Sequence, residues 1–131
     1  MRWFQKTRQP DVWELADVQP LGDIEAAQKI REICISADAI GEKLAGGRHA
    51  EKDKAAVTER YQAAIRRALE IAMKISDDSM RDASVSQIIG LCVTADHMKT
   101  ARILVRAIRS EITRVELIAR NPALAEGATR A

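Results

Sequence analysis

Apolar residues recur at alternating spacings of three and four along most of this chain, which is the period of an amphipathic helix. The first such stretch predicts a helix over residues 24–45, with Asp23 as its N-cap and Gly46 and Gly47 as its stop. Its buried face is expected to be formed by Ala26, Ile30, Ile33, Ala37, Ile40 and Leu44.

Two further helices follow from the same pattern. The stretch 53–76 is as long as the first helix, and the short polar linker 46–49 predicts that the two run antiparallel. Its apolar positions are Val57, Tyr61, Ala64, Ala68, Ile71 and Ile75. A shorter helix over residues 80–93 is expected to begin at a capping box made by Ser79 and Asp82, and Gly90 suggests a close helix crossing. Its apolar face holds Val85, Ile88, Ile89 and Cys92.

The most regular apolar pattern predicts a fourth helix, which begins at Asp96 as N-cap and ends near Asn121. Its positions are Met98, Ala101, Val105, Ile108, Ile112, Val115 and Ala119. A face of this length needs a long partner, and only the first two helices match it.

Composition agrees with an all-α protein. Of 131 residues, 47% are hydrophobic, enough for a core, and only 3% are aromatic, few for a protein built from sheets. We expect an antiparallel four-helix bundle or a short stack of helical hairpins, the bundle being slightly favoured because a solenoid normally needs at least three repeats. The predicted organisation is an aromatic N-terminal arm (1–22), a helical domain (23–121) and a flexible tail (122–131).

Residues 68–81 are echoed 33 residues later by residues 101–114. Three small or bulky positions recur in register, namely Ala68, Ala72 and Ile75 against Ala101, Val105 and Ile108. In these positions the stretch 68–114 resembles tetratricopeptide-type helical repeats. The resemblance implies antiparallel hairpins stacked into a solenoid and a peptide-binding role. Because the matching positions all lie on apolar faces, we interpret the echo as a shared packing requirement.

The N-terminal arm carries Trp3, Phe4 and Trp13, three of the four aromatic residues. One interpretation is that the arm folds back and caps the end of the helices. The other is that it is an aromatic docking segment for another protein or a second copy.

A basic row is expected on the fourth helix, where Lys99, Arg102, Arg106 and Arg109 fall within about 80° of one another. The second helix carries a similar row of Arg60, Arg67 and Lys74. Such rows can receive an acidic peptide or a nucleic-acid backbone. The alternative is that their stems cover the apolar faces and their charges pair with acids on the neighbouring helix, such as Glu59 or Glu70.

Signals for catalysis, metal binding or cofactors are weak. His97 with Asp96 and the acids near residues 77–82 could gather at two helix ends, but helix capping accounts for these acids. No phosphate loop or nucleophile motif occurs, so we expect no enzyme, no metal and no cofactor.

Cys34 and Cys92 are expected to be buried reduced thiols, which favours a reducing compartment. No apolar run reaches the roughly 18 to 20 residues that span a bilayer, and the N-terminal stretch lacks the pattern of a secretory signal. The chain is therefore predicted to be soluble and cytoplasmic.

Together these features favour a small protein–protein interaction or adaptor module that binds, or self-associates, through a helix face or the aromatic arm. The alternative is a binder of nucleic acid or an acidic partner through the basic C-terminal helix face.

Overall fold

The computed structural model describes residues 11–14, 21–45 and 51–125, and in them every regular element is helical. The all-α prediction is therefore confirmed. Within these ranges, five α-helices and two 3-10 helices follow one another as η1 (Val12–Glu14), α1 (Asp23–Ala45), α2 (Glu51–Ala72), α3 (Asp78–Thr94), α4 (Met98–Ala107), α5 (Glu111–Arg120) and η2 (Pro122–Ala125).

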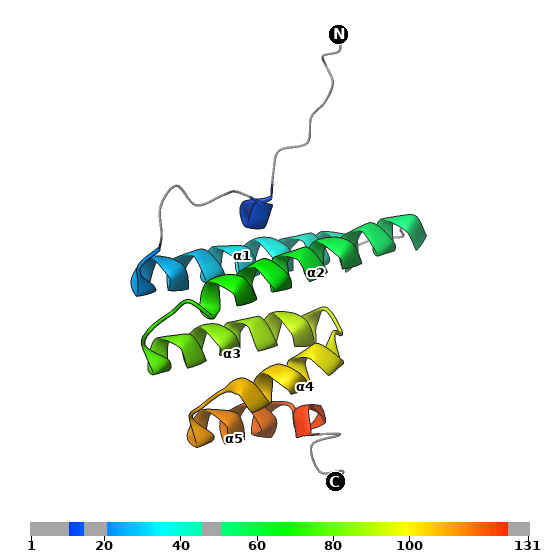
Figure 1. The fold of residues 1–131 in the computed structure, drawn as a ribbon. Coiled ribbons are helices and arrows are strands. Elements are labelled where there is room, and N and C mark those ends of the chain that lie inside the picture. The colour runs from blue at the N-terminus through cyan, green and yellow to red at the C-terminus, as the bar shows by residue number, and fades with distance from the viewer. Residues whose placement is uncertain (1–10, 15–20, 46–50, 126–131) are drawn as a thin grey trace.

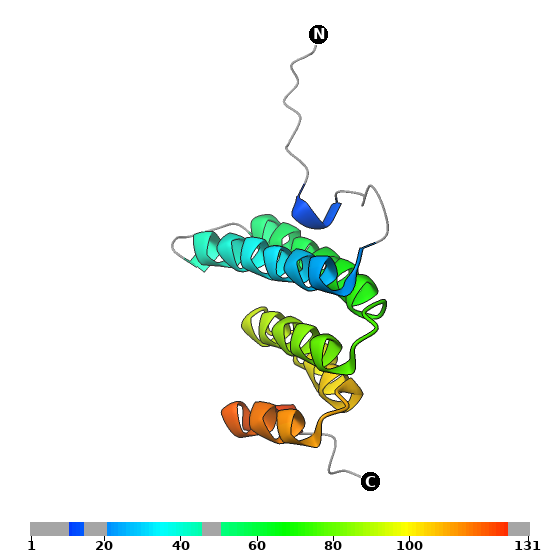
Figure 2. The same cartoon turned by 90° about the vertical axis from the view of Figure 1, so that its left-hand side faces the viewer.

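The helices pack as antiparallel layers in chain order (Figure 1). α1 and α2 form one hairpin, α3 packs against both of them, and α4 pairs with α3. α5 and η2 make the last layer and pack on α4. Figure 2 shows these layers from the side, with α1 and α2 at one end and α5 at the other.

The predicted apolar faces of the first three helices form the core. Residues of these faces that are fully buried, with an exposed fraction of 0%, include Ile30 and Ile33 of α1, Ala64 and Ala68 of α2, and Ile88 of α3. Ile40 and Val57 are half-buried and pack at the edge of this cluster. α2 contacts both α1 and α3, and its buried face includes a row of alanines one turn apart, Ala64, Ala68 and Ala72.

The predicted fourth helix is wrong, because the chain breaks it into α4 and α5. Ile108 takes an extended conformation with ψ of 131°, and Ser110 starts α5 as an N-cap that accepts a hydrogen bond from the Thr113 N–H. The buried carboxylate of Asp82 accepts bonds from the backbone N–H groups of Arg109 at 3.1 Å and Ser110 at 2.9 Å. These bonds provide acceptors for two backbone N–H groups of the turn and stabilise the break between α4 and α5. The continuous apolar pattern therefore spans two helices.

The joint between α2 and α3 is built in the same way. The Asp23 carboxylate accepts from the N–H groups of Ser76 at 2.9 Å and Asp77 at 3.0 Å. Asp77 then caps α3 by accepting from the Met80 N–H at 2.8 Å. The N-cap of α3 is thus Asp77 and not Ser79 as predicted. Asp82 does not form the predicted capping box with Ser79, because its carboxylate binds the turn between α4 and α5.

Close helix approach occurs at Gly41 and not at Gly90. A Cβ atom built on Gly41 would lie 1.9 Å from the hydroxyl oxygen of Tyr61, so any larger residue there requires the Tyr61 side chain to shift. Gly90 is exposed, and a Cβ atom on it would meet nothing within 4 Å. The expected N-cap Asp96 is also wrong: it takes a left-handed φ of 62°, and His97 occupies the cap of α4 without a side-chain hydrogen bond.

Both ends of the described chain belong to the packed structure. Trp13 in η1 is only 5% exposed and packs at the α1–α2 layer, with the Arg60 guanidinium 6.0 Å from the centroid of its ring. Leu124 in η2 is 3% exposed, so the packed region continues beyond the predicted boundary at residue 121. None of the described helices has the length and apolar character needed to cross a membrane.

Candidate functional site

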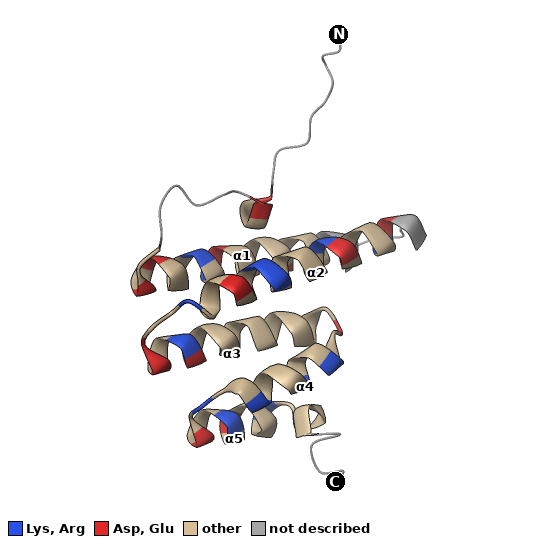
Figure 3. Ribbon diagram, in the orientation of Figure 1, with Lys and Arg blue, Asp and Glu red and all other residues tan. Residues whose placement is uncertain are grey.

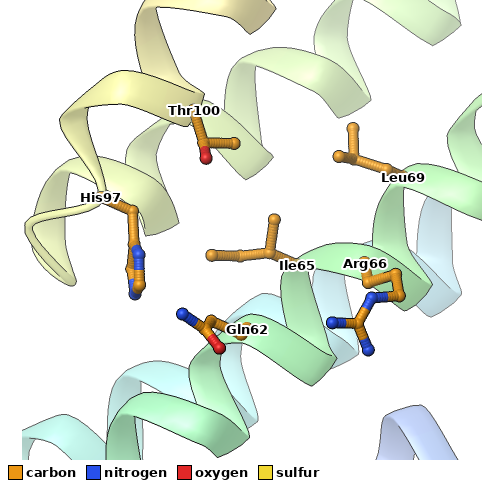
Figure 4. A pocket seen from close by; sticks show the side chains of 6 residues that line it. All are labelled: Gln62, Ile65, Arg66, Leu69, His97 and Thr100. Carbon is orange, nitrogen blue, oxygen red and sulfur yellow. The ribbon is translucent and has the colours of Figure 1, made fainter.

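An open groove of about 430 Å³ lies between α2 and the start of α4 (Figure 4). Its walls come from two helices that are not consecutive in the chain. The groove is lined by Gln62, Ile65, Arg66, Leu69, His97 and Thr100.

The α2 wall is the strip of that helix next to its buried alanine face. Ile65 is buried at 6% exposure, and Leu69, one turn later, is half-buried. Gln62 and Arg66 lie on the outer side of the same strip and are exposed. The wall is therefore apolar at its floor and polar at its rim.

The α4 wall is positioned by the turn that follows α3. The His97 N–H donates to the Cys92 carbonyl oxygen at 2.7 Å, and the left-handed residue Asp96 turns the chain toward α2. His97 and Thr100 are both half-buried, and Figure 4 shows them across the groove from Gln62 and Ile65.

Two exposed apolar side chains extend the apolar strip on either helix. Met73, one turn after Leu69 and directly after the last residue of α2, is 57% exposed. Ile103, one turn after Thr100, is 54% exposed. The exposed apolar surface therefore runs along both helices beyond the groove itself.

The helices that carry this surface bear residues of both charges, coloured in Figure 3, and three of the exposed ones are cations of interest. Arg66 stands on the α2 side, and Lys99 and Arg106 are exposed on α4. Within the described ranges none of these three cations takes part in an ion pair. Arg66 lines the groove itself, whereas Lys99 and Arg106 lie on the outer side of α4, within about 60° of Ile103.

The predicted basic row on the fourth helix is not a single row. Arg102 turns toward η2, where its Nε donates to the Ala123 carbonyl oxygen at 2.9 Å. Arg109 lies in the joint after α4, and its Nη1 is 3.8 Å from an oxygen of Asp78. Only Lys99 and Arg106 remain together as exposed cations on α4.

The basic row on α2 is divided as well. Arg60 pairs with Asp11 of the N-terminal segment, and Arg67 pairs with Glu70 at 3.3 Å on its own helix. Glu70 does pair with a basic residue, but with Arg67 of its own helix and not across to a neighbouring helix as the sequence suggested.

The aromatic docking residues have different outcomes. Trp13 is a core residue of this chain, so its ring is not accessible to a partner, and its assignment as a partner-binding residue is corrected. Trp3 and Phe4 lie outside the described residues, and their docking role stays a prediction.

Nothing in the described residues gathers into a metal site, since no group of three His, Cys, Asp or Glu side chains there could hold an ion. Asp77 and Asp82 are occupied by backbone N–H groups. Burial raises the pKa of the Cys34 thiol to about 12, with smaller contributions from Asp38 and Cys92. Burial likewise raises the pKa of Cys92 to about 11, so both thiols are protonated at neutral pH and are weak nucleophiles.

Sequence reasoning missed Gln62, Ile65, Leu69 and Thr100. A signal for the α2 half was present, because Ile65, Leu69 and Met73 recur every four residues beside the predicted apolar face. Which helix lies opposite depends on the order of the layers, and the pattern of one helix does not contain that information.

No protein-family model matches the chain, and the searches of curated proteins and of solved structures found no match either.

Proposed function

We propose that this chain is a small protein–protein interaction module that binds an apolar helical segment with acidic flanks in the groove between α2 and α4. The observation that carries the proposal is the combination of an apolar floor at Ile65 and Leu69 with one cation in the lining, Arg66, and two exposed cations, Lys99 and Arg106, beside Ile103 on α4. An amphipathic helix that lies in an apolar groove is a common mode of peptide recognition.

The apolar strip supplies the affinity. Full burial of one large apolar side chain contributes about 1.5 to 3 kcal/mol, and Met73 and Ile103 are both more than half exposed before a partner binds. The costs of association offset much of this gain, so we expect micromolar affinity. The cations add specificity and faster encounter, and their effect weakens with salt.

The resemblance of residues 68–114 to tetratricopeptide-type repeats supports the proposal, because such repeats are peptide-binding scaffolds. The layered hairpins agree with that arrangement. A docking role for Trp3 and Phe4 in the N-terminal arm would add a second contact outside the groove.

Two further expectations belong to this proposal. Binding, and not catalysis, is the activity, with no cofactor assigned. A cytoplasmic location fits two buried thiols that are unpaired in the described chain.

Nucleic acid is the less favoured partner. Arg102 and Arg109, two members of the row that would follow a phosphate backbone, are turned to η2 and to Asp78. The binding test below therefore includes a nucleic-acid arm.

A fluorescent 14-residue peptide with Leu at helical spacings of three and four and Glu elsewhere serves as the probe, and anisotropy measures its affinity. Two changes in the binding surface, Arg66→Glu and Ile103→Asp, should each weaken binding about tenfold, which is about 1.4 kcal/mol. Matched changes on α1, Arg31→Glu and Ile35→Asp, should leave it unchanged, because both residues are exposed on a different helix.

The same peptide with Lys in place of Glu should bind at least tenfold more weakly. Equal binding of the two peptides, or equal losses in the α1 variants, would overturn the proposal. Tight salt-sensitive binding of a single-stranded oligonucleotide with no binding of the acidic peptide would favour the nucleic-acid alternative.

A further inference from the structure

The outward face of α5 is apolar and open. Ile112 is 72% exposed and Val115 is 58% exposed, and Ala119 is exposed on the same stripe. No residue of α5 is buried, and the helix packs through its other side, where Leu117 and Ile118 touch the core. At 1.5 Å per residue, the stripe is about 10 Å long, comparable to the stretch from Ile65 to Met73 on α2.

Acidic residues flank this apolar stripe. Glu111 and Glu116 are exposed on either side of it, and neither has an ion pair among the residues that the structure describes. The exposed Arg120 follows Glu116 by one turn on the same flank. The face of α5 is therefore an apolar helical surface with Glu111 on one flank and Glu116 followed by Arg120 on the other, and its apolar stripe suits the groove between α2 and α4.

The α5 helix of the same chain is placed away from that groove. On α4, Thr100 lines the groove, whereas Arg102 reaches η2, which packs against α5. The two positions are about 200° apart around the helix, so the groove and the last layer lie on different sides of α4. A second copy is the natural source of an α5 helix for the groove.

Symmetric pairing of two α5 helices is disfavoured by charge. In an antiparallel pair centred on the stripe, the two-fold axis passes between Val115 and Glu116. The two copies of Glu116 would then face each other across the axis, on the same flank of the helix pair, where like charges repel each other.

We infer that α5 of one copy docks into the α2–α4 groove of the next, with Ile112 and Val115 on the apolar strip and Glu111 and Glu116 near Arg66, Lys99 and Arg106. This inference rests on the proposed function and names the partner. Such a contact joins two different surfaces, so each associated pair keeps one free groove and one free α5 and can extend into short chains.

Sedimentation velocity of the full chain tests this directly, over concentrations from about 10 µM to about 1 mM because small interfaces of this kind are weak. The sedimentation coefficient of the wild type should rise with concentration beyond that of a dimer and fall again at high salt. Ile112→Asp removes one surface, Ile103→Asp removes the other, and each variant alone should remain monomeric.

The decisive sample is the equimolar mixture of these two variants. Because each keeps the surface that the other lacks, the mixture should form a one-to-one dimer and nothing larger. Ile35→Asp, a change at an equally exposed isoleucine of α1, should assemble as the wild type does. Circular dichroism confirms that each variant is folded.

Several results would overturn the inference. A wild type that is monomeric at all concentrations would do so, as would a mixture that stays monomeric or an Ile103→Asp variant that still dimerises. If the wild type is monomeric but the acidic Leu–Glu peptide binds the groove, the partner is wrong and the proposed function stands. If neither occurs, both fail.

Discussion

Arg81 and Arg114 occupy equivalent places in two joints of this fold, the one between α2 and α3 and the one between α4 and α5. Each donates from Nη1 to the carbonyl oxygen of the residue six positions earlier, Ile75 in one joint and Ile108 in the other. The 33-residue echo in the sequence thus repeats a complete joint, including a buried isoleucine, a capping residue and an arginine clamp. It is more than a shared packing requirement.

Asp82 is the residue on which the second joint depends most. Replacing it with Ala leaves the N–H groups of Arg109 and Ser110 without their acceptors at a part-buried turn, and we expect a loss of about 1 to 3 kcal/mol in the free energy of unfolding. Asp82→Asn, which keeps one acceptor, should lose less. Chemical denaturation measures both.

Asp78→Ala is the matched control for that change. Asp78 is 60% exposed and pairs with Arg81 and Arg109 at the surface, so its loss should cost less than about 1 kcal/mol. Equal effects of the two alanine changes would show that the joint does not depend on the buried carboxylate.

Two glycines should respond to alanine in opposite directions. Gly41→Ala places a Cβ atom against the Tyr61 hydroxyl and should destabilise the fold by about 1 to 3 kcal/mol. Gly90→Ala should stabilise it by about 0.5 to 1 kcal/mol, because the position is helical and open.

A double variant tests the cause at Gly41. With Tyr61→Phe the clashing oxygen is gone, so Gly41→Ala should cost less in that background, although the ring carbon that carried the oxygen remains 3.0 Å from the new Cβ. An unchanged cost would place the strain elsewhere.

The buried thiols predict how stability depends on pH. The pKa of Cys34 rises from its ordinary 9.0 to about 12, and that of Cys92 to about 11, because burial opposes the charged form. The unfolded chain therefore loses these protons first. The contribution of the two thiols to the free energy of unfolding is therefore fully present below pH 9 and is lost as the pH rises toward 11 and 12.

A comparison with the Cys34→Ala, Cys92→Ala double variant isolates this effect. Above pH 9 the free energy of unfolding should fall more steeply for the wild type than for the double variant. Parallel curves would mean that the thiols are not buried as described.

The apolar spacing predicted the buried faces of α1, α2 and α3 because each is set by neighbours within one helix. The break at Ile108 was missed because the apolar pattern continues through it, while the bonds that hold it come from Asp82, 27 residues earlier. A local clue existed: the echo aligns Ser110 with Asp77, and both are helix caps.

The candidate site was predicted less well for the same reason. The basic row assumed one continuous helix, so Arg109 was placed on a face that it does not share. The groove needs α2 and α4 side by side, a relation set by the stacking of whole hairpins.

Methyl NMR of the isoleucine side chains tests the central claim, that the partner surface is the groove between α2 and α4, most directly. Ile65 and Ile103 report on the groove and its extension, whereas the exposed Ile24 and Ile35 report on α1. On addition of the acidic Leu–Glu peptide, we expect shifts that saturate together at Ile65 and Ile103 and no change at Ile24 or Ile35. Shifts confined to Ile24 and Ile35 would contradict the account.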